Sequence, residues 1–330
     1  MIPKELFANV RRIEITTKRL ATDVFAGQYH SVFKGQGMEF DEVREYQMGD
    51  DIRAIDWNVT ARTGRPHIKK FVEERELTVM ILVDASASCR FATVKQLKSQ
   101  LAAEIAAALA FSAINNDDKV GLIIFTDQIE KFIPPRKGLR HVLRVIREVL
   151  YFEPKRHSTD IVRALDYLNK VTTRRAVGFI VSDFFETPPT FPPPQRGEGS
   201  ILNSLPLVGR PACRTGRVRE GDNDLKKALK MTNRRHDMIA VTLNDPAEMD
   251  LSNCGVLELE DAETGQRILL DSSDQNLRER YRQQAVERLR DRETLFNSVD
   301  MDHVDLSTNS SYVQELIKFF LKRRRKLARK

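Results

Sequence analysis

The chain has 330 residues, of which 41% are hydrophobic and 31% are charged, and its formal net charge is +7. This length and balance are typical of a globular protein with one large domain or two. No window approaches the ~18 uninterrupted apolar residues of a membrane-spanning helix. The first fifteen residues contain acidic side chains and no apolar core, so we expect no signal peptide.

The positive charge belongs to one end of the chain. Residues 318–330 hold eight Lys or Arg residues and no acidic ones, so the rest is close to neutral. We therefore expect no nucleic-acid-binding surface on the main body. The three cysteines, Cys89, Cys213 and Cys254, are few, odd in number and widely spaced. They predict neither a disulfide framework nor a zinc site, and they favour a reducing, cytoplasmic location.

Residues 1–75 form a first predicted region. Apolar positions over 4–20 have the spacing of an amphipathic helix, and alternating glycines and aromatics over 27–40 predict a hairpin or bent strand. The stretch 41–65 is dense in charge and contains Trp57, the only tryptophan. It is interpreted either as a structural ion-pair network around a buried Trp57 or as a recognition face for a partner protein. The candidate partner-binding residues are Asp50, Asp51, Arg53, Asp56 and Trp57.

The central stretch is Leu77–Ser88, reading LTVMILVDASAS. Its apolar part lacks alternation, as in a strand that is buried on both faces. Asp84, Ser86 and Ser88 then follow at every second position. In an extended loop these side chains point the same way, so three oxygen donors converge at the carboxyl end of a strand, facing solvent. Open α/β sheets bind ligands there. The alternative is a strand followed by a Ser-rich helix cap.

Two later segments favour the ligand site. Residues 177–183 (VGFIVSD) read as a second buried strand that ends in a carboxylate, Asp183. Thr159 lies just before a predicted helix over 161–170. We interpret its neighbour Asp160 as the first residue of that helix and not as a ligand.

An Asp-x-Ser-x-Ser motif followed by a Thr and an Asp resembles the metal-ion-dependent adhesion site of von Willebrand factor A domains. The matching residues are Asp84, Ser86, Ser88, Thr159 and Asp183. The resemblance implies a bound Mg²⁺, with Mn²⁺ or Ca²⁺ as alternatives, and capture of an Asp or Glu from a partner. This chain departs from many A domains in having Ala85 and Ala87 in place of glycines, and Cys89 in place of methionine.

A second resemblance extends over nearly the whole chain. Gly49–Arg53, then Ile55–Trp57, and the Asp84 motif resemble the bacterial domain-of-unknown-function family 58 (DUF58). Members join a short N-terminal region to a von Willebrand A-like domain and are often encoded beside MoxR-type AAA+ ATPases. The resemblance therefore implies such an ATPase as a partner.

The remaining pattern alternates helices and strands through 76–330, which predicts an α/β fold. The resemblance makes it von Willebrand A-like (Rossmann-like), with a mostly parallel sheet, helices on both faces and a small N-terminal region with β-structure. Further helices are predicted over 94–114, 139–150, 225–235, 276–296 and 310–330, strands over 119–125, 128–133, 237–243 and 303–306, a turn at 245–248, and a hairpin over 255–270.

Two segments have no clear place in that fold. Residues 187–221 hold seven of the thirteen prolines and no periodicity, which predicts a disordered insertion, with a Pro-rich partner motif as the alternative. The basic helix over 310–330 is either a solvated end or an electrostatic docking element for an acidic partner or anionic lipid. The second reading places the protein peripherally at the inner face of the membrane.

The sequence contains no Walker A motif and no Gly-x-Ser-x-Gly elbow, and its six histidines are scattered. We expect a non-enzymatic, metal-dependent interaction module that serves as an adaptor for a MoxR-type AAA+ ATPase in protein maturation or remodelling. The alternative is a structural scaffold with a vestigial metal site, which recognises partners through the 41–65 face.

Overall fold

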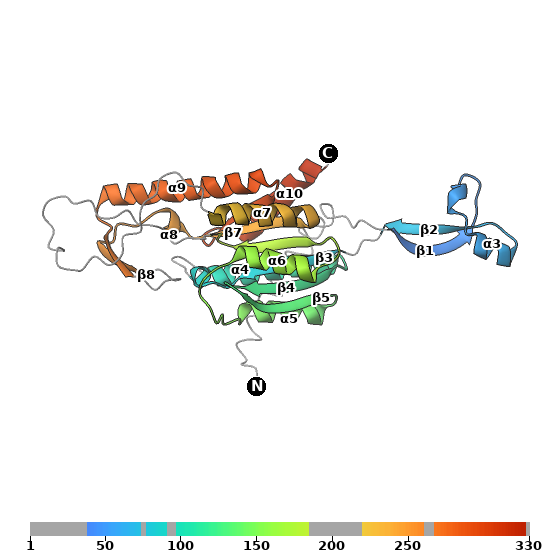
Figure 1. Ribbon diagram of the computed structural model, residues 1–330, viewed down its shortest axis with the longest axis horizontal. Coiled ribbons are helices and arrows are strands. Elements are labelled where there is room, and N and C mark those ends of the chain that lie inside the picture. The colour runs from blue at the N-terminus through green and yellow to red at the C-terminus, as the bar shows by residue number, and fades with distance from the viewer. Residues whose placement is uncertain (1–37, 74–76, 91–96, 185–219, 261–266, 328–330) are drawn as a thin grey trace, which may run out of the picture.

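The computed structural model describes residues 38–73, 77–90, 97–184, 220–260 and 267–327. It consists of an α/β body and a small β-hairpin unit (Figure 1). The predicted helix over 4–20, most of the predicted 27–40 hairpin and nearly all of the 187–221 insertion lie outside the described residues.

The body is built on a six-stranded sheet with the order β10-β7-β6-β3-β4-β5. All neighbours pair in parallel except β5, which runs antiparallel to β4 at one edge. Parallel strands buried on both faces require the continuous apolar runs seen in the sequence. The strands are β3 (Thr78–Asp84), β4 (Lys119–Phe125), β5 (Ile129–Arg136), β6 (Val177–Ser182), β7 (Asp237–Asn244) and β10 (Asp302–Ser307).

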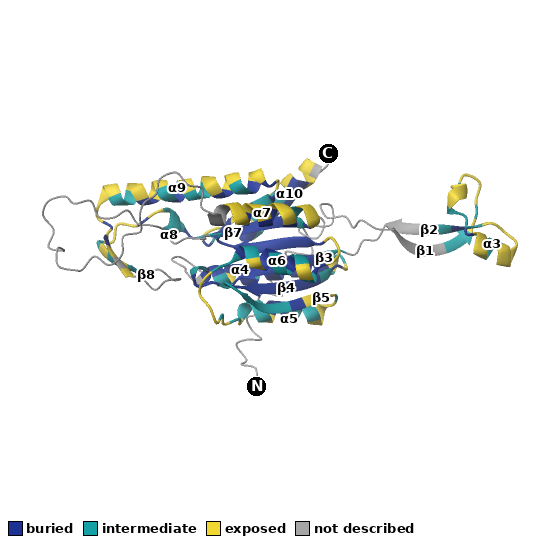
Figure 2. Ribbon diagram, viewed as in Figure 1, coloured by how far each residue is buried: buried dark blue, intermediate teal, exposed yellow. Residues whose placement is uncertain are grey.

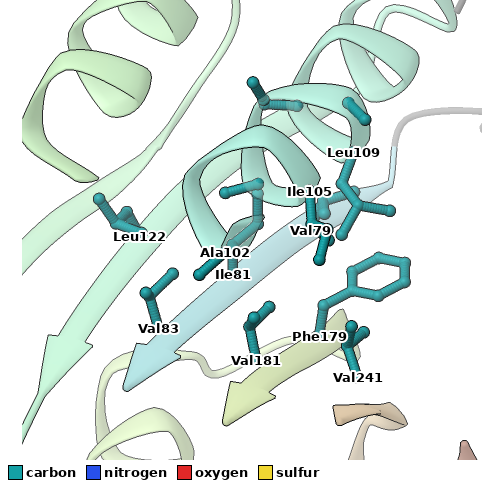
Figure 3. Packing of buried hydrophobic residues seen from close by; sticks show 14 of the residues in the cluster. Val79, Ile81, Val83, Ala102, Ile105, Leu109, Leu122, Phe179, Val181 and Val241 are labelled. Atoms are coloured by element: carbon teal, nitrogen blue, oxygen red, sulfur yellow. The ribbon is translucent and has the colours of Figure 1, made fainter. Parts of the chain in front are cut away.

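Helices cover both faces of the sheet. One face packs against α4 (Lys98–Asn115), α5 (Leu139–Leu150) and α10 (Tyr312–Leu327), and the other against α6 (Ile161–Val171), α7 (Glu220–Arg235) and α9 (Gln275–Ser298). Alternate residues of β3 serve the two cores, Ile81 on the first face and Leu82 on the second. Figure 3 shows Ala102, Ile105 and Leu109 of α4 above the first face. The predicted α/β class, with a mostly parallel sheet and helices on both faces, is confirmed.

Strand β3 lies where the winding of the sheet reverses. It pairs with β4 on one side and with β6 on the other. The chain passes from β3 through α4 to β4, then through α5 and α6 back to β6. The carboxyl ends of β3 and β6 therefore flank the switch point, which is where open α/β sheets bind ligands.

Short elements lie along the chain between β7 and α9. The turn predicted at 245–248 is a helical turn, α8 (Pro246–Met249), because Asp245 caps it and Pro246 occupies its first position. The predicted 255–270 hairpin is present as β8 (Val256–Glu260) and β9 (Arg267–Asp271). Figure 1 shows α8 and the β8–β9 hairpin at the carboxyl end of the main parallel strands. Helix α7 begins at Glu220, inside the range predicted as an insertion.

The N-terminal unit pairs β1 (Met38–Glu45) with β2 (His67–Glu73) in antiparallel fashion. Between them lie a 3₁₀ turn, η2 (Ile52–Ala54), and the short helix α3 (Trp57–Thr63). The predicted β-structure of this region is thus confirmed, with strands farther along the chain than the 27–40 pattern indicated. The unit precedes β3 in the chain, so it is joined to the amino end of that strand.

The basic tail is partly structural. Arg323 in α10 is buried, and its Nη atoms lie 2.5 Å from Asp237 Oδ2 and 3.1 Å from Asp302 Oδ2. Lys326 Nζ lies 2.9 Å from Asp302 Oδ1. Arg323 therefore holds α10 to the first residues of β7 and β10, and the reading of the cluster as a solvated end is wrong for this residue. Lys326 is exposed, and the docking role of the tail stays a prediction. No helix in the described part of the chain has the length and apolarity needed to cross a bilayer.

Candidate metal centre

Asp84 ends β3 and is 2% exposed. Its Oδ1 accepts a hydrogen bond from the backbone N–H of Ser86 at 2.9 Å, and its Oδ2 accepts one from Ser182 Oγ at 2.6 Å. The predicted solvent-facing carboxylate is therefore a buried one, bonded to Ser182 at the neighbouring end of β6. Ser182 was missed in the sequence because it reads as part of an apolar strand.

The two motif serines lie together. Residues Ala87–Arg90 form a 3₁₀ turn, η3, in place of the expected extended loop. Ser86 is fully buried, and its Oγ lies 3.0 Å from Ser88 Oγ. The turn therefore brings the two hydroxyls together at the end of β3. The i, i+2 spacing predicted this proximity, but from an extended loop and not from a 3₁₀ turn.

Asp183 follows β6 and completes a buried group of donors. One ligand atom from each of Asp84, Cys89 and Asp183 lies within 4.8 Å of the other two. Burial, together with the charge of Asp183, raises the pKa of Asp84 to about 6. Burial also raises the pKa of the Cys89 thiol well above its usual range. Carboxylate and hydroxyl oxygens fit a hard divalent cation such as Mg²⁺, and a cation would relieve the repulsion between the two aspartates.

Thr159 lies in a neighbouring loop. The backbone N–H of Ala87 donates to the carbonyl oxygen of His157 at 3.0 Å, which holds that loop against the Asp84 motif. Thr159 is half-buried, and Asp160 caps α6 by accepting from the N–H of Arg163 at 2.9 Å. Asp160 thus begins the helix, as the sequence indicated. The ligand role of Thr159 stays a prediction.

Lys98 is the main residue that the motif did not reveal. It is the first residue of α4, is fully buried, and places Nζ 3.3 Å from Asp183 Oδ2 and against Glu248 Oε1. Burial alone would lower the pKa of Lys98, but the charges of Asp183 and Glu248 outweigh it and raise the pKa, so the amine is an ammonium. A lysine in the first turn opposes the helix dipole, but the helix predicted over 94–114 did not place Lys98 in its first turn.

Glu248 is itself held in place by α8. Its Oε2 accepts the backbone N–H of Asp245 at 3.0 Å, while its Oε1 faces Lys98. Asp245 Oδ1 accepts from the N–H of Ala247 at 3.0 Å, and its Oδ2 accepts from Thr308 Oγ1 at 2.8 Å. Glu248 therefore meets Lys98 from a fixed position and not from a mobile side chain.

Arg292 of α9 joins three strand ends. Its Nη1 donates to the carbonyl oxygen of Asp183 at 3.0 Å, and its Nη2 donates to Asn244 Oδ1 at 2.9 Å and to Asp305 Oδ1 at 3.0 Å. These acceptors follow β6, end β7 and lie within β10. Arg292 was missed because only the packing of α9 brings it to these strands.

The predicted partner-binding carboxylates lie far along the chain from this centre, and three of them have local structural contacts. Asp50 accepts from Arg44 Nη2 at 2.7 Å, Asp51 caps η2, and Asp56 caps α3 while pairing with Lys69 Nζ at 3.1 Å. Arg53 is exposed. The ion pairs of the structural interpretation are thus present.

The structural interpretation also predicted a buried Trp57, and this part of it is wrong. Trp57 is 68% exposed, and Ile52 and Met48 are also among the exposed large hydrophobic residues. Figure 2 shows most of α3 in the exposed colour. We call these three exposed side chains of the hairpin unit the exposed apolar group.

Solved structures with a similar fold include an aerotolerance-related membrane protein from Bacteroides fragilis (15% identity, TM-score 0.44) and the conserved hypothetical protein BatB from Bacteroides thetaiotaomicron (13%, 0.43). Each likeness covers 76% of this chain and 99% of the other. The SpRpn10 VWA domain is more distant, at 10% identity and a TM-score of 0.34, covering 73% of this chain and 94% of that one. At these TM-scores, none of the three adds to what the sheet topology already shows.

Relatives by sequence include the uncharacterized proteins Rv1480 of Mycobacterium tuberculosis and Mb1516 of Mycobacterium bovis. Each is 28% identical over 323 residues, which is 97% of this chain and 90% of the relative. A family model matches residues 42–200 and 214–291, leaving a gap inside the predicted insertion. Because that match extends over more than half of the chain, the protein belongs to the family described as "Protein of unknown function DUF58".

Proposed function

We propose that this protein is a non-enzymatic, metal-dependent protein-interaction module that works as an adaptor for a MoxR-type AAA+ ATPase. The observation that carries the metal part is the meeting of Asp84, Asp183 and the hydroxyls of Ser86 and Ser88 at the switch point of the sheet. Of the two buried carboxylates, Asp183 contacts the Lys98 ammonium, whereas Asp84 has only neutral donors among the described residues and is costly to keep ionised without a cation.

The chain's own residues would hold the ion from one side. Asp84 and Asp183 would supply charge, in part through water, while Ser86, Ser88 and Thr159 would supply neutral oxygens. A bound Mg²⁺, or Mn²⁺ or Ca²⁺ in its place, supplies an electrophilic coordination position for an Asp or Glu of a client protein. Asp84 is kept in orientation by Ser182 and by the N–H of Ser86, so the donor set needs little reorganisation.

The ATPase partner, the work in protein maturation or remodelling, and the cytoplasmic location form the remainder of the proposal, which rests on the DUF58 resemblance and the sparse cysteines. Peripheral contact with anionic lipid through the end of α10 belongs to it too. In the described part of that end, Lys322, Arg324 and Arg325 are exposed. No nucleic-acid partner is proposed.

The test is calorimetric titration with Mg²⁺ in a carboxylate-free buffer, followed by co-purification with the organism's MoxR-type ATPase with and without a chelator. Asp84→Asn should weaken Mg²⁺ binding by about tenfold or more, since it removes one of the two carboxylate charges of the donor set. Asp160→Asn is the matched control, because Asp160 caps a neighbouring helix and should not change Mg²⁺ binding. Equal Mg²⁺ affinity in wild type and Asp84→Asn would refute the metal site.

A scaffold with a vestigial metal site is the second candidate. Two observations favour it: Lys98 already places a positive charge beside Asp183, and Trp57, Ile52 and Met48 are exposed within the charged 41–65 face. A scaffold would bind its partner equally well in the presence of a chelator.

A further inference from the structure

The centre contains a positive charge that belongs to the protein. The Lys98 ammonium is fully buried and contacts carboxylate oxygens of Asp183 and Glu248. These carboxylates come from β6 and α8, 85 and 150 residues away along the chain. The two carboxylates keep the buried lysine charged, since burial without them would favour the neutral amine.

Asp84, unlike Asp183, has no cation of the described part of the protein beside its carboxylate. Its recorded hydrogen bonds come from a hydroxyl and a backbone N–H, and among the described residues no ion pair to it is found. Asp84 and Asp183 are neighbours, yet one shares a cation of the protein and the other is held by neutral donors. The two aspartates of the motif are therefore not equivalent.

We infer that Lys98 is a positioning residue that withholds Asp183 from a metal ion, so that the ion is held through Asp84 and the hydroxyls of Ser86 and Ser88. This inference rests on the proposed function and deepens it by assigning unequal roles to the two aspartates. Glu248 is the second positioning residue, because α8 fixes it where it shares the ammonium with Asp183.

The inference has a functional consequence. A donor set with one unpaired carboxylate leaves a divalent ion with more of its positive charge than a set with two. Ion affinity is lower in such a site, and the attraction for a carboxylate from outside the protein is higher. Lys98 therefore lowers the affinity for the ion and raises the attraction of the bound ion for an Asp or Glu side chain of a client protein, as the proposed function requires.

The experiment is titration of Mg²⁺ and Mn²⁺ into wild type and Lys98→Met, by calorimetry and by the electron paramagnetic resonance signal of free Mn²⁺. Freed from Lys98, Asp183 should join the donor set, so we expect affinity to increase by about tenfold or more. Lys98→Arg should stay near wild type, since it keeps the charge. Lys227→Met is the control for loss of a lysine, because Lys227 is exposed on α7.

Lys98→Met leaves Glu248 without its cation and is the variant most at risk of not folding. The double variant Lys98→Met with Glu248→Gln removes both charges together, and the same increase in affinity is expected of it. Unchanged or weaker binding in the folded variants, with wild type binding normally, would overturn only the role of Lys98. Binding by the variants but not by wild type would support that role and refute metal dependence of the natural protein. No binding by either would overturn both.

Discussion

Asp84 makes the stability of the metal-free protein depend on pH. Its pKa is raised to about 6 from the ordinary 3.8, by burial and by the charge of Asp183. The folded state therefore holds the proton more tightly than the unfolded state does. This contribution to stability is fully present below about pH 4 and is lost as the pH rises through 6, and it amounts to about 3 kcal/mol.

Asp84→Asn should remove that dependence. Without metal, the variant should gain stability relative to wild type by up to about 3 kcal/mol between pH 4 and pH 7, because the amide never ionises. Urea unfolding across that pH range measures the difference, and Mg²⁺ at pH 7 should stabilise wild type alone. Parallel pH curves for the two proteins would contradict the explanation.

At the level of residues, sequence reasoning grouped most of the residues that meet at the end of β3 and missed their surroundings. Asp84, Ser86, Ser88 and Asp183 could be grouped because strand ends and i, i+2 spacing are local features. Lys98, Glu248 and Arg292 could not be grouped with them, because only tertiary packing brings α4, α8 and α9 to one strand end. The burial of Asp84 was mispredicted for the same reason: it depends on Ser182, a neighbour in the sheet and not in the chain.

At the level of elements, α10 is anchored by one of its arginines. Arg323→Gln should destabilise the protein by about 3 kcal/mol, since it leaves Asp237 and Asp302 without their partly buried partner. Arg324→Gln is the matched control, an exposed neighbour whose loss should change stability by less than about 0.5 kcal/mol. Thermal or urea unfolding of the two variants makes the comparison, and equal stabilities would show that the anchor is unimportant.

The same anchor limits what truncation of the tail can reveal. A chain ending after Leu321 would lose Arg323 and Lys326 together with the exposed cations, so weaker association with lipid or with the ATPase could follow from loosening of α10 alone. Substitution of Lys322, Arg324 and Arg325 removes only exposed charges. The helix itself was predictable from its apolar spacing, whereas its contacts with the amino ends of β7 and β10 required knowledge of the strand order.

At the level of the whole molecule, the two candidate recognition surfaces attach to opposite ends of one strand. The hairpin unit precedes β3, and the metal centre follows it. Seven residues of extended chain separate the two attachment points by about 20 Å. The hairpin unit and the metal centre can therefore contact different partners, and their roles can be tested separately.

Trp57→Ala should leave Mg²⁺ affinity unchanged and should change stability by less than about 0.5 kcal/mol, because the side chain is largely exposed. Binding of the MoxR-type ATPase in a pull-down should fall, if the exposed apolar group is the recognition surface. Asn58→Ala, an exposed neighbour on α3, is the control. Undiminished binding by Trp57→Ala would remove this surface from consideration.

The position of this single indole also gives the protein a natural optical probe. Since Trp57 is the chain's only tryptophan, emission excited selectively at the indole comes entirely from the hairpin unit. Its spectrum should be that of a water-exposed indole and should barely respond when Mg²⁺ is added. A shift to shorter wavelength on mixing with another protein would then report contact at the hairpin without any label. Binding at the Asp84 centre would leave the emission unchanged.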